Sequence, residues 1–295
     1  MTAVAASSRR LATAQRYLSV PVLATGLLFF VLYWKPFTTL LNDWWVNPDA
    51  QHGLLLAPIA LYLAWRSGIA TNARPQRGLG IAVLVAAVVL RYLSGLAAEL
   101  FTMRFSMLLG AAALVVYAYG FRQLLRWWLP ALLLLLSVPL PTVVLNSLAF
   151  PLQLQASKMG AALLASRHVP VLLAGNVIHL PGQALFVTEA CSGLRSLTAL
   201  IALGLLIGGI FLTSPWTRTL VLLAAIPVAM FLNGIRIFLT GFLVYFVDPK
   251  LGEGFMHYSE GWVIFVVAFA ILGAFSWLLA RIEQTRRRHR AAEGA

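Results

Sequence analysis

Hydrophobic residues in this chain are concentrated in runs that carry few charges, and short polar segments separate these runs. A run of roughly 17–25 apolar residues, coiled as an α-helix, is long enough to cross the hydrocarbon core of a bilayer. We therefore predict an all-α polytopic membrane protein with about eight transmembrane helices in one integral membrane domain, residues 1–295. The predicted spans are residues 18–34, 52–66, 78–97, 101–119, 127–148, 191–212, 220–246 and 260–280.

One segment departs from this pattern. Residues 149–189, between the fifth and sixth predicted spans, mix polar and apolar positions. Over residues 149–168 the polar side chains are spaced as in an amphipathic helix, which we expect to lie on the outer membrane surface. Residues 170–180 and 183–188 are β-prone and flank a Pro-Gly pair at 181–182, so they predict a small hairpin.

The distribution of positive charge predicts the orientation of the chain. Of the 22 Lys and Arg residues, 14 fall on the alternate segments that this topology places inside, so both termini are expected to be cytoplasmic. A net charge of +13 would suggest nucleic acid as the partner of a soluble protein. A hydrophobic fraction of 61% and a mean hydropathy of +0.86 exclude a soluble domain, and arginines at span ends explain the charge by orientation. We expect contact with the lipid bilayer and none with nucleic acid.

The single cysteine, Cys191, lies where the polar segment gives way to the sixth span, in the run Glu-Ala-Cys-Ser-Gly-Leu-Arg-Ser-Leu at 189–197. One cysteine allows neither an intramolecular disulfide nor a cysteine-based zinc site, and we predict no metal and no cofactor. A lone cysteine in a bundle is commonly a small packing residue. Here it would open a helix, where backbone N–H groups and the helix dipole favour a thiolate, and Arg195 one turn on adds positive charge. Both interpretations stay open.

Arg236 lies between two isoleucines deep in the seventh predicted span. An arginine inside an apolar helix costs several kcal/mol unless it finds a partner or a polar cavity. At 1.5 Å per residue it has climbed roughly 25 Å along its helix, towards the outer face that also holds Cys191. Asn233, one turn earlier, would orient the guanidinium. The alternatives are a structural ion pair, with Glu189 or Glu260, and snorkelling to the outer headgroups.

A nucleophilic thiol needs an acid or base partner with a pKa near neutral, and histidine is the usual one. His257 lies in the outer loop directly before the last predicted span. His52, at the start of the second span, is its rival. The topology therefore predicts that Cys191, Arg236 and a histidine meet at one membrane face, with His257 preferred.

These stretches resemble the signature of the exosortase/archaeosortase family. The run at 189–197 resembles its cysteine motif, Asn-Gly-Ile-Arg-Ile at 233–237 its arginine motif, and His257 before an apolar span its histidine motif. The run Asp-Ala-Gln-His-Gly at 49–53 resembles an early histidine-glycine region of the same family. The resemblance covers about residues 40–280 and includes the plan of spans.

The resemblance implies a membrane cysteine protease or transpeptidase with Cys191 as nucleophile, and Arg236 and His257 as the other catalytic residues. Arg195, Asn233, Glu189 and His52 would support them. Such enzymes, in the bacterial inner membrane, cleave exported proteins at a C-terminal sorting signal and transfer them to an acceptor. The signal is a short motif, typically Pro-Glu-Pro (a PEP-CTERM signal), then a transmembrane helix and a basic tail. The active site would face the periplasm. The subtype, the motif, the acceptor and the oligomeric state are left open.

Two other classes of protein share some of these features. A transporter would place polar groups near mid-membrane in broken helices, whereas the polar groups of this chain gather at one membrane face. The predicted spans also lack paired carboxylates for proton coupling. A lipid-linked glycosyl or acyl transferase would use outer-face arginines but would not need the cysteine. A membrane protease differs from the favoured transpeptidase only in using water to resolve the thioester.

Overall fold

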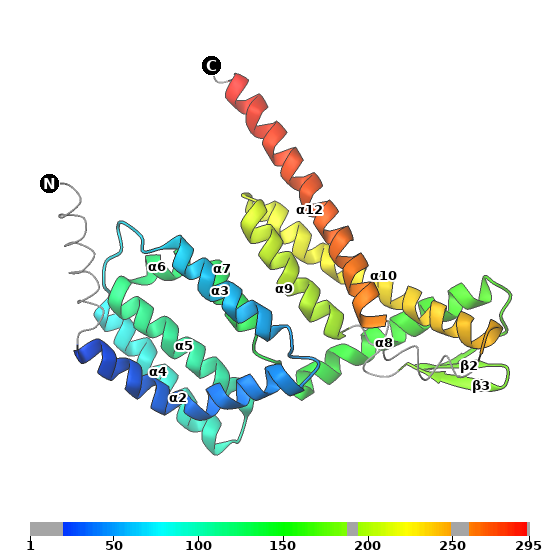
Figure 1. The fold of residues 1–295 in the computed structure, drawn as a ribbon, viewed down its shortest axis with the longest axis horizontal. Helices are drawn as coiled ribbons and strands as arrows, with labels where there is room; N and C mark the ends of the chain where they lie inside the picture. Colours follow the sequence, from blue (N-terminus) through cyan, green and yellow to red (C-terminus); the bar gives the residue numbers. More distant parts are fainter. Residues whose placement is uncertain (1–19, 188–193, 249–259, 294–295) are drawn as a thin grey trace.

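The computed structural model describes residues 20–187, 194–248 and 260–293 (Figure 1). The described helices are α2 (Val20–Val46), α3 (Gly53–Ser67), α4 (Arg77–Leu96), α5 (Leu100–Tyr119), α6 (Phe121–Arg126), α7 (Trp128–Leu136), α8 (Thr142–Ala165), α9 (Leu194–Phe211), α10 (Pro215–Phe246) and α12 (Glu260–Glu293). The described strands are β1 (Leu172–Ala174), β2 (Val177–Leu180) and β3 (Gln183–Phe186).

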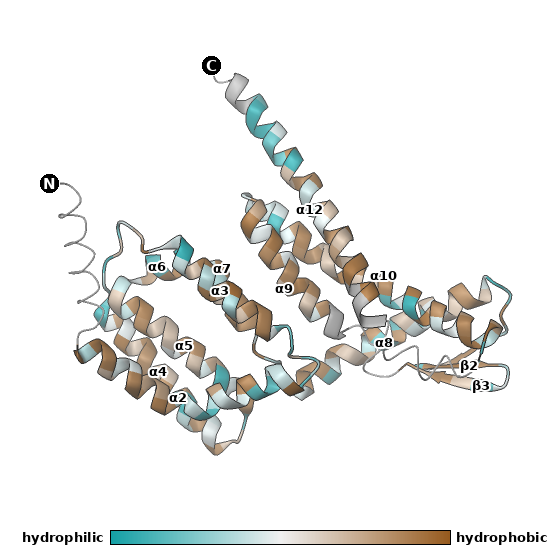
Figure 2. Ribbon diagram, viewed as in Figure 1, coloured by the Kyte–Doolittle hydropathy of each residue, from teal (hydrophilic) through white to brown (hydrophobic). Residues whose placement is uncertain are grey.

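The all-α polytopic class is confirmed by the length and composition of these helices. Among the described residues, α2, α4, α5, α10 and residues 266–289 of α12 are long and apolar enough to cross a membrane. Helix α3 and residues 197–211 of α9 are shorter apolar helices. Brown, hydrophobic residues dominate the helices in Figure 2, whereas the last turns of α12 are hydrophilic. The count of eight spans and the cytoplasmic termini stay predictions.

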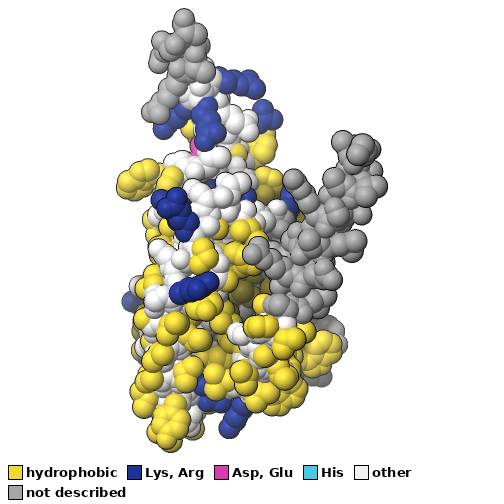
Figure 3. All heavy atoms as spheres, turned by 90° about the vertical axis from the view of Figure 1, so that its left-hand side faces the viewer, with side chains coloured by type: hydrophobic (Ala, Val, Ile, Leu, Met, Phe, Trp, Pro, Cys, Tyr) yellow, Lys and Arg dark blue, Asp and Glu magenta, His cyan; other side chains and the backbone are white. Residues whose placement is uncertain are grey.

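The surface agrees with a lipid environment. Figure 3 shows the face formed by the N-terminal half, where hydrophobic side chains cover most of the described surface and Lys and Arg gather mainly towards the end from which α12 projects. Leu27, Leu28 and Val31 of α2 are each more than 60% exposed. Such a band would be an aggregation hazard in water and is the expected surface in a bilayer.

Helices α2 to α7 form the N-terminal half (Figure 1), in which α4 and α5 make an antiparallel hairpin. Gly80 allows this close approach, because a Cβ there would lie 2.6 Å from the backbone of Tyr117. Glu99 caps α5 by accepting hydrogen bonds from the N–H groups of Phe101 and Thr102, at 2.9 and 2.6 Å. Burial alone would raise the pKa of Glu99, but these hydrogen bonds outweigh it and lower the pKa.

Helix α2 is longer than predicted. The sequence suggested a span ending at residue 34 and an outer loop over 35–51, yet the helix continues to Val46. Tertiary contacts stabilise the extension: Asp43 forms an ion pair with Arg104 at 2.8 Å, and Trp44 donates its indole N–H to the carbonyl of Ser137 at 2.7 Å. Polar residues that look like a loop in the sequence are therefore the inward face of a helix.

The fifth predicted span, 127–148, is not one helix. Helix α7 ends at Leu136 and α8 begins at Thr142, so the boundary expected at 149 is wrong. The interruption falls at Pro139 and Pro141. Pro141 precedes the first turn of α8 with φ −57° and has no N–H to donate. Helix α8 then continues to Ala165.

Helix α8 also differs from the predicted surface helix. Its polar residues Gln153 and Ser157 are buried, at 5% and 0% exposure, whereas Val143 is 78% exposed. The buried face packs against α10, and the two helices lie side by side (Figure 1). The size of the side chains decides which face of α8 packs against α10, because small residues on α8 allow the two backbones to approach closely.

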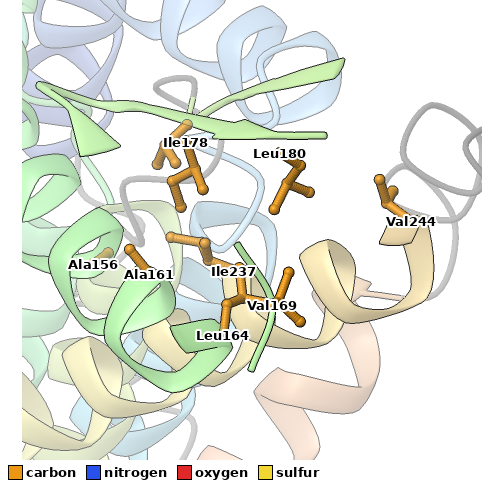
Figure 4. Close-up of a cluster of buried hydrophobic side chains, with 9 residues drawn as sticks. Ala156, Ala161, Leu164, Val169, Ile178, Leu180, Ile237 and Val244 are labelled. Atoms are coloured by element: carbon orange, nitrogen blue, oxygen red, sulfur yellow. The ribbon is translucent and has the colours of Figure 1, made fainter. Parts of the chain in front are cut away.

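The predicted hairpin is confirmed and gains a third strand. Strands β2 and β3 pair antiparallel around the turn at 181–182, with Leu180 opposite Gln183, and β1 adds to the other edge of β2. Gly182 has φ +86°, which glycine adopts without strain. In Figure 4, Ile178 and Leu180 of the sheet face a cluster that includes Leu164 of α8 and Ile237 of α10. The sheet therefore covers the α8–α10 pair.

Helices α9, α10 and α12 complete the C-terminal half. Helix α12 continues well beyond the predicted end at 280. Its Glu283 accepts hydrogen bonds from Thr213, Ser214 and Thr217, so the carboxylate holds α12 against the α9–α10 connection. Arg287 adds a hydrogen bond to the hydroxyl of Thr213 at 2.6 Å.

Candidate active site

Helix α10 carries both predicted site residues of the arginine motif. Asn233 is buried at 3% exposure, and Arg236 is half-buried one turn later. The hydroxyl of Thr240 donates to the carbonyl of Arg236 at 3.0 Å, within the same helix. This buried turn of α10 holds the arginine at a fixed place in the bundle.

The glycine between these residues has a packing role. A Cβ at Gly234 would collide with the side chain of Met159 on α8. Gly160 of α8 in turn faces Ile237, and Leu164 faces Gly241. The residue numbers at these contacts rise along α8 and α10 in the same order, so the two helices run parallel. Close packing of α8 therefore fixes the rotation of the turn that carries Arg236.

The first two turns of α9 and α12 contribute to one hydrophobic cluster with this part of α10. One hydrophobic cluster contains Leu197 of α9, Ile264 of α12, and Leu232 and Ile235 of α10. Leu197 is in the first turn of α9 and Ile264 is in the second turn of α12. Three stretches that are distant in the sequence thus converge around the residues that flank Arg236.

The other predicted catalytic residues adjoin these helix starts in the sequence. Helix α9 begins three residues after Cys191, and α12 begins three residues after His257. Cys191, Glu189 and His257 themselves lie outside the described residues. Arg195 lies in the first turn of α9, and only its place in the helix is described.

His52 is engaged elsewhere. It precedes the first turn of α3, and its Nε2 lies 3.0 Å from the carbonyl of Leu136, which makes Nε2 the donor. Trp44 binds the next carbonyl, and Gly53 packs against the indole, where a Cβ would collide. His52 therefore ties α3 to the end of α7, within the N-terminal half. The structure does not place it in the cluster around Arg236.

Sequence reasoning missed two features. The first is Arg104, which is 2% exposed and paired with Asp43. Like Arg236, it is an arginine inside an apolar helix, so the sequence signal is the same. The second is a cavity between α8 and α10, next to Gly234. Glycines in α8 and α10 were the available signal for close helix packing, although only the structure pairs them.

Among the described residues no three His, Cys, Asp or Glu side chains are grouped so that they could hold a metal ion.

Comparison with known proteins identifies the family of this chain. The family model for transmembrane exosortases matches residues 44–274, which is most of the chain and includes all three motifs. No curated protein and no solved structure shows significant similarity. By this match, the chain belongs to the transmembrane exosortase family.

Proposed function

We propose that the protein is a membrane cysteine transpeptidase that cleaves exported proteins at a C-terminal sorting signal. Membership of the exosortase family supports a membrane transpeptidase. The observation that carries the cysteine mechanism is that residues near the starts of α9 and α12, Leu197 and Ile264, share a hydrophobic cluster with Leu232 and Ile235 of α10. It brings the helices that follow Cys191 and His257 in the sequence together with Arg236.

The first half-reaction forms a thioester. The Cys191 thiolate attacks the carbonyl carbon just before the transmembrane helix of the substrate, and the carbonyl oxygen takes the negative charge of the tetrahedral intermediate. The guanidinium of Arg236, together with Arg195, stabilises the thiolate and this oxyanion. The C–N bond then breaks, and His257 gives a proton to the leaving amine. The products are an acyl-enzyme and the released helix with its basic tail.

The second half-reaction releases the exported protein. An acceptor nucleophile loses its proton to His257 and attacks the thioester carbonyl. The C–S bond breaks, and the Cys191 thiolate is regenerated. The acceptor is a group on the outer side of the bacterial inner membrane, and water in its place would make the enzyme a protease. Asn233 and Glu189 would hold the catalytic groups in position.

The substrate is the one that membership of the exosortase family implies. It is a membrane-anchored protein that ends in a short motif of the Pro-Glu-Pro type, an apolar helix and a basic tail. The helix would lie beside the enzyme's own spans, with the basic tail on the cytoplasmic side and the scissile bond at the periplasmic face.

Two cysteine variants test this function. A reporter carrying such a C-terminal signal is expressed with the full chain, and processing is followed as a decrease in reporter size. Cys191→Ala and Cys191→Ser should leave the reporter uncleaved, because neither provides a thiolate. A thiol-reactive probe should inactivate the unmodified protein, and substrate peptide should protect it. Normal processing by both variants would mean that the cysteine mechanism is wrong.

A further inference from the structure

A cavity of about 330 Å³ lies between α8 and α10 beside the arginine motif. Its lining residues are Gln155, Ala156, Lys158, Met159 and Met230. The volume is at the lower end of the range for ligand pockets and suits one or two side chains rather than a large cofactor. The thioethers and Ala156 provide an apolar wall, and the exposed Gln155 and Lys158 form the polar rim.

This cavity adjoins the stretch of α10 that precedes Arg236. Met159, which lines it, is the residue that faces Gly234, and Met230 lies six residues before Arg236 on the same helix. Six residues of α-helix correspond to about 9 Å along the axis. An extended polypeptide covers this distance with about three residues. A peptide with its scissile bond at Arg236 could therefore place a neighbouring side chain in the cavity.

The charge at the rim is positive. Lys158 is exposed on α8, and in the part of the chain that the structure describes no acidic side chain forms an ion pair with it. By the topology above, it lies on the outer side, where the positive-inside rule disfavours lysine. A lysine ammonium beside a glutamine amide, above an apolar wall, is complementary to a short side chain that ends in a carboxylate.

We infer that this cavity is a substrate subsite in which Lys158 and Gln155 bind the carboxylate of an acidic residue, within about three residues of the scissile bond. The inference rests on the proposed function and deepens it, because it assigns the acidic residue of the sorting motif to particular side chains. Met159 and Met230 contact the methylene groups of that residue, and Lys158 selects its charge.

A charge exchange tests the subsite. Membranes that contain the full chain, unmodified or as Lys158→Glu, are supplied with two reporters whose motifs carry either Glu or Lys at the acidic position. The unmodified chain should process the Glu reporter at least tenfold faster. Lys158→Glu should reverse this preference or abolish it, because like charges now face each other in the Glu complex. An unchanged ratio would overturn the subsite.

The ratio of the two reporters is measured within each variant, so a change in the amount of folded enzyme does not affect it. Arg167→Glu is the matched control, since Arg167 is an exposed cation just after α8 that does not line the cavity. The control should keep the original ratio. An equal change in both variants would mean that overall surface charge acts, and this result too would overturn the subsite.

Cys191→Ala separates the two hypotheses. If Cys191→Ala is inactive but Lys158→Glu keeps the original reporter ratio, the subsite is wrong and the transpeptidase stands. If Cys191→Ala still processes both reporters, the proposed function is wrong, and the subsite assigned to it falls with it.

Discussion

Two arginines in apolar helices show how the halves of this molecule differ. Arg104 in the N-terminal half is 2% exposed, and its guanidinium contacts Asp43 at 2.8 Å. Arg236 in the C-terminal half is only half-buried, and its neighbour Ile235 shares a hydrophobic cluster with the starts of α9 and α12. Gly234, two residues earlier, packs against Met159, which lines a cavity. An arginine that holds helices together can be sealed from its surroundings, whereas one that acts on a substrate must be reachable. The sequence signal, an arginine among apolar residues, is the same for both.

The surroundings of the two arginines differ in the same way. In the N-terminal half several polar side chains bind within the protein: Glu99 caps α5, and Trp44 and His52 bind the carbonyls at the end of α7. In the C-terminal half, Lys158 and Gln155 are exposed at the rim of a cavity. We therefore propose that the N-terminal half is a scaffold and that recognition and chemistry belong to the C-terminal half.

The largest expected effect separates the two arginines directly. Arg236→Lys should reduce processing about 10²–10³-fold with little change in protein stability, because lysine keeps the charge but loses the planar fork of donors. Arg104→Lys should keep most of the activity per folded molecule. Processing rates normalised to folded protein measure both. Full activity of Arg236→Lys would make Arg236 another structural cation.

The ion pair of the scaffold gives the next effect. Asp43→Asn leaves a buried guanidinium without its counter-charge, which should destabilise the protein by about 3–5 kcal/mol. The double variant Asp43→Leu, Arg104→Met should recover much of this loss, because no buried charge remains. Thermal unfolding in detergent compares the variants. A stable Asp43→Asn protein would show that the pair contributes little.

The packing of α8 on α10 should have an intermediate effect. Gly234→Ala forces Met159 to move and should cost about 1–3 kcal/mol. Processing should fall further than this loss of stability explains, because Arg236 shifts with its helix. Met159→Ala in the same chain should restore part of the activity. If Gly234→Ala melts and processes like the unmodified protein, α8 does not fix the arginine.

The smallest effect is expected at the end of α12. Glu283→Gln weakens the hydrogen bonds from Thr213, Ser214 and Thr217 by removing the charge of the acceptor, at a cost of about 1 kcal/mol. Activity per folded molecule should be unchanged, since Glu283 is on the part of α12 remote from Glu260. Hydrogen exchange in the α9–α10 connection would report the loosening. Lost activity with intact structure would extend the functional region to this end.

The candidate site was predictable to the extent that local sequence encodes it. The arginine motif, the turn at 181–182 and most helix positions follow from hydropathy and from the chemistry of Pro and Gly, and the family match includes the three motifs. His52 was not predictable in this way, because its part in joining α3 to α7 depends on the carbonyl of Leu136, a residue 84 positions away.

The sequence alone determined the class of the protein, because long apolar runs have few stable arrangements other than membrane helices. It also determined the residue types of the candidate site. Only the tertiary structure decided that residues 35–46 continue α2, that Gln153 and Ser157 of α8 are buried, and that Arg104 is almost fully buried while Arg236 is half-buried. Each of these depends on a partner distant in the chain, and the hydropathy of a single segment does not specify that partner.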